Sequence, residues 1–341
     1  MNKFLTFPGA QRRAVFMETA TRIHLPAAAI EKDFWVTEIL NILFSLPYAD
    51  KMVFKGGTSL SKVWGVIQRF SEDIDIAIDR SMFGIEGDVT KKQLKKLRKA
   101  SSVFVRDTIA SDLVTAIEIA GLHKFVTVKA DPDGEGDATY PEPRQIHIFY
   151  KSVLPPEVNT YLRDEVLLEV GARSLFEPTA NALVDSFVAT EFPHLTSRDA
   201  DVRIVAAVAE KTFLEKSFLL HELFTTEGCR NANRKSRHLY DLYKMMDADF
   251  AEKAIANDEL WETIRHHREI FTSVSDVDYT PDIRKRICLV PPEEVLEEWK
   301  NDYETMVSHM IYEDKIPSFD NILEGVATIE SKFREYGLFR T

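Results

Sequence analysis

Apolar residues recur with different periods in the two parts of this chain. Before residue 178, the periods predict helices at 11–23, 27–46, 59–67 and 91–122, and strands at 51–54, 73–78, 124–129, 144–150 and 165–170. After residue 205 strand signals vanish, and the pattern predicts helices at 206–224, 234–248, 249–256, 260–271, 291–313 and 319–333. We therefore predict an α+β fold with two domains: a sheet flanked by helices over residues 1–190 and a mainly helical half over 191–341.

The composition is that of an ordinary globular protein, with 45% hydrophobic and 29% charged residues. No apolar run approaches the ~20 residues that span a bilayer, and the first residues do not resemble a signal peptide. The only two cysteines, Cys229 and Cys288, indicate neither a disulfide framework nor a cysteine zinc site. We expect a cytoplasmic protein that does not bind membranes.

Charge is distributed unevenly along the chain. The formal net charge of -12 argues against sequence-independent coating of nucleic acid, although it leaves room for a local basic groove. Residues 91–99, KKQLKKLRK, form a basic run at the start of the longest predicted helix. On spacing alone, this run is best interpreted as a solvated helix face.

A strand–turn–helix–strand unit at residues 51–78 carries the candidate chemistry. Gly56 and Gly57 allow the backbone to turn sharply and to approach a ligand closely. Thr58 or Ser59 is then predicted to cap the helix, whose first N–H groups would point at a phosphate. The turn is therefore a candidate phosphate cradle.

The following strand contains two aspartates, Asp73 and Asp75, separated by an isoleucine. Alternate residues of a strand face the same side, so the two carboxylates lie roughly 6.5–7 Å apart along one face. Such a pair can be solvated and idle on an exposed strand. On an otherwise buried strand, however, the repulsion between the two charges usually requires a cation. Next to a phosphate cradle, the pair predicts a divalent metal site for a nucleoside triphosphate.

Four blocks of the sequence resemble a known family in the same order along the chain. They are residues 30–37 (IEKDFWVT), 56–78 with GGTS and DID, 211–221 (KTFLEKSFLLH) and 237–243 (RHLYDLY). The order of the Gly-Gly turn and the Asp-x-Asp strand resembles the nucleotidyltransferase fold shared with DNA polymerase beta. The four blocks together are similar to the AbiEii/AbiGii toxins, the nucleotidyltransferase half of type IV toxin–antitoxin and abortive-infection systems. The resemblance implies a mixed sheet and a helical half that contributes to the active-site cleft.

The resemblance implies a third acidic residue from a later strand, and Glu169 is the candidate. It would join Asp73 and Asp75 in binding Mg²⁺ or Mn²⁺. The competing interpretation is that Glu169 is a buried acid paired with Arg173 or Arg144.

The resemblance also gives Lys216 a catalytic role, in which it would neutralise charge that develops on the triphosphate. Without the resemblance, Lys216 would be interpreted as an exposed helix lysine paired with Glu215 or Glu222.

Further candidates flank these motifs. Arg69 and Ser71 stand where the family has a basic residue and a serine that suit triphosphate oxygens. Asp241 would take part in the active site, or it would hold Arg237 toward phosphate in a salt-bridge ladder that includes Lys244, because these three residues share a helix face.

The resemblance implies a phage-defence toxin that transfers a nucleotide from an NTP to RNA, for example to the 3′ end of tRNA. Its partner would be a separate antitoxin that need not bind the toxin tightly. One alternative keeps the fold but transfers AMP or another NMP to a protein side chain. Another is a non-catalytic nucleotide-binding scaffold, against which the intact pair Asp73 and Asp75 argues.

Overall fold

The computed structural model describes residues 2–71, 73–156, 162–196, 202–226, 231–246 and 248–338. The chain forms two compact units, which are described separately. The first comprises Met1–Val63 and Phe70–Ala207, and the second comprises Trp64–Arg69 and Val208–Thr341. The short segment Trp64–Arg69 therefore belongs to the second unit, although its neighbours on both sides belong to the first.

Among the described residues, the first unit contains a seven-stranded mixed sheet with the order β3-β4-β5-β2-β1-β7-β6. The central strand β2 runs antiparallel to β1 and parallel to β5, so the predicted mixed sheet is confirmed. The bounds of the strands are β1 Met52–Lys55, β2 Asp73–Ile78, β3 Val126–Ala130, β4 Arg144–Tyr150, β5 Glu165–Gly171, β6 Thr179–Ala182 and β7 Ile204–Ala207.

One face of this sheet is apolar and packs against helices. Ile74 and Ile76 of β2 are at most 1% exposed, and β4 and β5 contribute further buried aliphatic residues to the same face. Helices α2 (Ala27–Leu43) and α5 (Ala110–Ile119) contact the sheet, and all 17 residues of α2 are buried. The remaining helices of this unit are α1 Gly9–Ile23, α3 Gly56–Lys62, α4 Lys91–Phe104 and α6 Phe187–Glu191.

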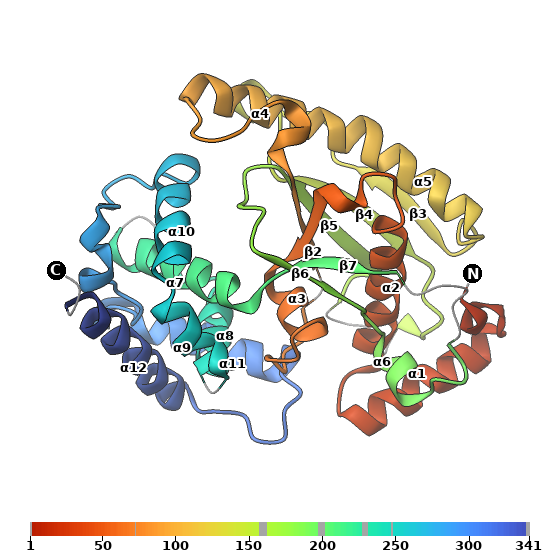
Figure 1. The fold of residues 1–341 in the computed structure, drawn as a ribbon. Helices are drawn as coiled ribbons and strands as arrows, with labels where there is room; N and C mark the ends of the chain where they lie inside the picture. The colour runs from red at the N-terminus through yellow and green to blue at the C-terminus, as the bar shows by residue number, and fades with distance from the viewer. Residues whose placement is uncertain are drawn as a thin grey trace. The chain divides into compact units, whose positions relative to one another are not determined.

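Helices α4 and α5 continue one another along the sheet (Figure 1). A π-helical turn at Val105–Ile109 joins them. The sequence pattern predicts one helix over 91–122, and this irregular turn divides it into two.

In the described part of the second unit, secondary structure is helical apart from one isolated β-bridge. Helix α7 (Ala209–Thr225) lies at its centre, buries Phe213, Leu214 and Phe218, and contacts α8, α9 and α10. The bounds of the other helices are α8 Ser236–Met246, α9 Asp249–Ala256, α10 Asp258–Phe271, α11 Leu296–Met310 and α12 Phe319–Leu338.

The expectation that strands end before residue 205 is wrong. β7 pairs in parallel with β1 and antiparallel with β6, and α7 begins only at Ala209. β7 has four residues, and so short an apolar run cannot be distinguished from the first turn of a helix by period. β6, also of four residues, has the sequence TANA and carries no apolar alternation. In the described part of the chain, no helix is both long and apolar enough to cross a membrane.

Candidate active site

Four neighbouring strands carry polar side chains at the same level of the sheet. Asp75 on β2 lies opposite Lys55 on β1 and beside Glu169 on β5, and Glu169 lies opposite Gln145 on β4. Residues paired in this way point to the same face, which also holds Asp73 because it lies two positions from Asp75. All five side chains are half-buried. The face opposite the apolar one therefore carries the predicted carboxylates.

Gln145 is a member of this row that the sequence interpretation missed. Its Nε2 donates to Glu169 Oε1 at 2.6 Å, whereas Arg144 pairs with Asp133. Arg144 is thus not the partner of Glu169. The alternation of β4 could have revealed Gln145, since it faces away from the buried Ile146.

Gly56 places the turn directly against the second aspartate. Its φ of +77° is a left-handed conformation that side chains with a Cβ rarely adopt. A Cβ built at this position would lie 2.1 Å from Asp75 Oδ2. Position 56 therefore requires glycine for two separate reasons: its backbone conformation, and the close approach of the Asp75 carboxylate.

The prediction that Thr58 or Ser59 caps the helix is wrong, because α3 already begins at Gly56. Both residues are buried within the helix. Thr58 Oγ1 donates to the carbonyl oxygen of Asp73 at 2.5 Å and lies 2.9 Å from Ser71 Oγ, while Ser59 Oγ donates to the carbonyl oxygen of Gly56 at 3.2 Å. These hydroxyls fasten the turn to the start of β2. Their contact with phosphate, like that of Gly57, stays a prediction.

The two aspartates of this face suit a divalent cation, but a complete set of ligands is not assembled among the described residues. Asp73 and Asp75 offer hard oxygen ligands on one side of a strand, which suit Mg²⁺ or Mn²⁺. In the described residues, however, no group of three or more His, Cys, Asp and Glu side chains converges closely enough to hold a metal ion. The joint ligand set with Glu169 therefore stays a prediction.

The second unit contains a buried ionic cluster. Arg69 Nε and Nη2 donate to Asp241 Oδ1 and Oδ2 at 2.6 and 2.8 Å, and Lys216 Nζ lies 2.9 Å from Asp241 Oδ2. Arg69 is 2% exposed, Asp241 0% and Lys216 7%. Lys216 is thus not an exposed lysine, and its acidic partner is Asp241.

The segment that carries Arg69 is fixed within the same unit. The backbone N–H of Gln68 donates to Tyr240 Oη at 3.3 Å, and the carbonyl oxygen of Gln68 accepts from the N–H of Tyr312 at 3.0 Å. Arg69 also pairs with Ile311 as an isolated β-bridge. These contacts determine where the guanidinium lies before any ligand is considered.

Burial and the charges within this cluster shift the pKa values of Asp241, Lys216 and the neighbouring His238. Burial alone would raise the pKa of Asp241, but the charges of Arg69 and Lys216 hold it below its usual range. Burial lowers the pKa of Lys216, and Asp241 partly opposes that effect. Burial and the charges of Lys216 and Arg237 lower the pKa of His238 well below its usual value. A neutral His238 can accept a hydrogen bond from Lys216, whose Nζ lies 3.2 Å from its Nδ1.

The predicted ladder of Arg237, Asp241 and Lys244 is wrong at its last step. Lys244 Nζ pairs with Glu313 Oε2 at 2.7 Å, whereas Asp241 binds Arg69 and Lys216. The ladder was inferred from spacing along one helix, and the actual partners come from distant parts of the chain. Arg237 contributes positive charge near Lys216 and His238.

Behind the turn, α2 binds the end of α3. Lys62 Nζ lies 2.5 Å from Asp33 Oδ1, and Asp33 Oδ2 accepts from the N–H of Phe187 at 2.8 Å. On the other side, Glu31 accepts hydrogen bonds from Ser152 and Val153. Asp33 therefore supports the helix that follows the turn, whereas Glu31 binds the segment that follows β4.

We expect Gly56→Ala to destabilise the first unit by about 1–2 kcal/mol, because the left-handed conformation is strained for alanine. We also expect about a tenfold loss of enzymatic activity, since the new methyl group must displace the carboxylate of Asp75. Urea denaturation and an activity assay measure the two effects. Gly84→Ala is the matched control: its φ is +66° and no atom lies within 4 Å of the added Cβ. Gly84→Ala should lose stability but keep its activity. Equal activity losses in the two variants would contradict the claim that the methyl group at position 56 acts by displacing the carboxylate of Asp75.

A mixed sheet with a glycine turn against an Asp-x-Asp strand, followed by a helical unit, is the arrangement expected of a nucleotidyltransferase. The chain belongs to the family of AbiEii nucleotidyltransferase toxins of type IV toxin–antitoxin systems, whose family model matches residues 39–325. The family predicted from the four sequence blocks is therefore confirmed. Enzymes of this class act on nucleoside triphosphates with a divalent metal ion, and the toxin–antitoxin class implies an antitoxin partner.

Two solved structures resemble the chain at low sequence identity. MenT4, the nucleotidyltransferase toxin Rv2826c of Mycobacterium tuberculosis H37Rv, is 15% identical with a TM-score of 0.53, over 96% of this chain and 88% of MenT4. JHP933 from Helicobacter pylori is 12% identical with a TM-score of 0.44, over 91% of this chain and 94% of JHP933. The likeness to MenT4 confirms the fold. A search of curated proteins finds none that matches this chain.

Proposed function

We propose that this chain is a metal-dependent toxin that transfers NMP from an NTP to an RNA acceptor, such as the 3′ end of tRNA. The observation that supports this best is the approach of Gly56 to Asp75, which joins a turn suited to phosphate to a carboxylate suited to a metal ion. Family membership supports the nucleotidyltransferase chemistry. The acceptor is our inference, and so is the role of such a toxin in phage defence.

Asp73 and Asp75 would hold Mg²⁺ or Mn²⁺, with Glu169 as a third ligand, while the backbone at Gly56 and Gly57 contacts the triphosphate. When bound, the ion would neutralise the triphosphate and align it for in-line displacement of pyrophosphate by the acceptor hydroxyl. Gln145 holds Glu169 in place through its hydrogen bond.

We also propose a role in transfer for the positive charge of the buried cluster. Asp241 orients Lys216 and Arg69, and Lys216 would stabilise charge on the leaving pyrophosphate, with Arg237 nearby.

The test offers each of the four radiolabelled NTPs, with Mg²⁺, to the purified chain together with either tRNA or whole-cell protein. We expect label on RNA, and none with the Asp75→Asn variant. Label on protein alone would overturn the RNA acceptor in favour of a protein NMP-transferase. NTP binding without any label would overturn transfer itself and leave the scaffold interpretation.

The antitoxin is tested separately. We expect co-expression of the cognate antitoxin to relieve growth arrest without forming a stable complex on gel filtration. A tight complex would contradict a partner that acts without direct binding.

A further inference from the structure

Helix α4 presents a basic face that the proposed chemistry does not use. Five of its lysines are exposed, and the residue that anchors the helix to the core is Leu97, which is 0% exposed. The exposed lysines are Lys91, Lys92, Lys95, Lys96 and Lys99. Residues four apart lie about 6 Å apart along a helix, so the row 91, 95 and 99 spans about 12 Å. The chain as a whole carries a net charge of -12, so the positive charge of these lysines is a local concentration on an acidic protein.

A pocket of about 480 Å³ adjoins this face within the first unit. The described residues that line it include four cations and no acid: Lys91, Lys95, Arg98 and Arg173, together with Leu94, Gly136, Thr139 and Tyr140. Arg98 Nε donates to the carbonyl oxygen of Tyr140 at 2.7 Å, and Lys99 Nζ lies 5.2 Å from the centre of the Tyr140 ring. The pocket thus combines positive charge with an aromatic ring.

We propose that the α4 face, defined as the five exposed lysines and this pocket, binds the sugar–phosphate backbone of the RNA acceptor. The inference rests on the proposed function and extends it to the position of the acceptor. Phosphates fit the lysine row through charge, and an unpaired base or ribose fits the pocket beside Tyr140.

Other partners fit this surface less well. A helix that binds a membrane exposes large apolar side chains beside its lysines, whereas the large exposed hydrophobic residues in the described part of the chain lie outside α4. A flat membrane surface would also not enter the pocket. An acidic protein could bind the lysines, and the experiment below distinguishes it from RNA.

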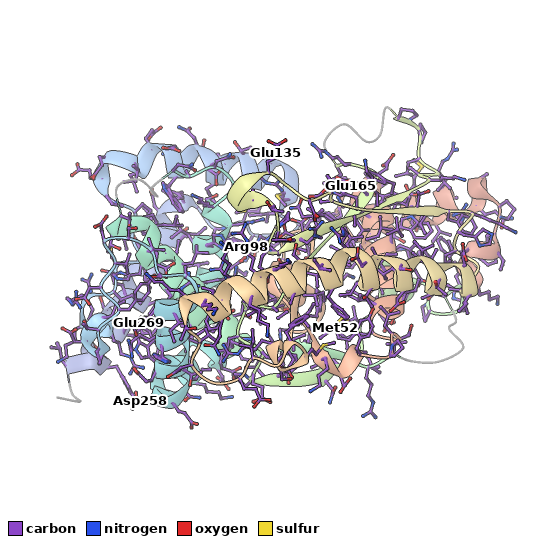
Figure 2. All side chains as sticks on the ribbon, turned by 90° about the horizontal axis from the view of Figure 1, so that it is seen from above. Met52, Arg98, Glu135, Glu165, Asp258 and Glu269 are labelled. Atoms are coloured by element: carbon purple, nitrogen blue, oxygen red, sulfur yellow. The ribbon has the colours of Figure 1, made fainter. Side chains whose placement is uncertain are left out.

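The α4 face lies within reach of the candidate active site. Arg173 follows Glu169 by four residues, which limits the distance between their Cα atoms to about 14 Å, and Glu169 lies beside Asp75 in the sheet. Figure 2 shows Arg98 on the long helix and Glu135 on the loop whose Gly136 and Thr139 line the pocket. Glu135 is exposed and directly precedes Gly136 of the pocket, so its charge would oppose RNA there.

The experiment measures binding of a fluorescent single-stranded RNA of about twenty nucleotides across a series of salt concentrations. For the double variant Lys92→Glu and Lys96→Glu, we expect Kd to rise at least about tenfold and the salt slope to fall by about 2, one per lost phosphate contact. Glu135→Lys should lower Kd, which a misfolded variant could not do. Lys124→Glu with Lys151→Glu changes the net charge equally on exposed positions of the same unit. This control should change Kd less than about twofold.

Three outcomes would overturn the proposal. They are an unchanged Kd in the α4 variant, equal weakening in the control, and displacement of the RNA by polyglutamate at equal charge concentration. Asp75→Asn should bind RNA as the parent does. A failure of nucleotide transfer in the parent would refute the proposed function without changing the binding result, so the two failures are distinguishable.

Discussion

Replacing Asp75 with asparagine is expected to lower nucleotide transfer about a thousandfold while leaving the fold intact. The substitution keeps the shape of the side chain and removes the charge that would bind the metal ion. Losing several kcal/mol of charge stabilisation corresponds to about three orders of magnitude in rate. Steady-state transfer from radiolabelled NTP measures the effect.

Thermal unfolding with and without Mg²⁺ separates this effect from misfolding. In the parent, Mg²⁺ should raise Tm because it binds the folded state, whereas Asp75→Asn should show little response. The matched control is Asp107→Asn, an exposed acid of the same unit that pairs with Arg106. It should keep both activity and the response to Mg²⁺. Full activity in Asp75→Asn would refute the proposed mechanism.

Asp241→Asn is expected to destabilise the second unit by about 3 kcal/mol. It leaves Arg69 and Lys216 as buried cations without their carboxylate, and removing one partner of a buried ion pair costs about 3–5 kcal/mol. Urea denaturation at neutral pH measures the difference.

The pH dependence of this difference tests its electrostatic origin. The pKa of Asp241 in the folded state lies below its unfolded value of about 3.9, so its contribution is fully present above that value and is lost as the pH falls. The gap between parent and variant should therefore narrow by about 1 kcal/mol between pH 6 and pH 3. Glu252→Gln is the control, because Glu252 pairs with Lys332 at the surface and its loss should cost less than about 1 kcal/mol. A gap that does not change with pH would contradict the ionic interpretation.

The sequence predicted what depends on local pattern. Strand β2, with Asp73 and Asp75 on one face, follows from alternation, and the turn at Gly56 follows from two adjacent glycines. The helices of the second unit follow from the 3.6-residue period, since their apolar residues form continuous stripes. These features are encoded within a few residues of one another, so they can be read without the fold.

What the sequence did not predict depends on contacts between distant residues. Arg69 and Asp241 are 172 positions apart, and no spacing rule connects them. The hydroxyl of Thr58 matched the pattern of a helix cap, but tertiary packing buries it against the start of β2. The sequence pattern places Ala206 and Ala207 of β7 at the start of a helix, because a short apolar run carries no clear period.

The short segment Trp64–Arg69 has a consequence for how this protein can be divided. Because it belongs to the second unit while both of its flanks belong to the first, the backbone passes from one unit to the other at Val63, at Arg69 and at Ala207. No single cut releases two complete halves. A fragment that ends at Ala207 would carry Arg69 without Asp241, and a fragment that begins at Val208 would carry Asp241 without Arg69.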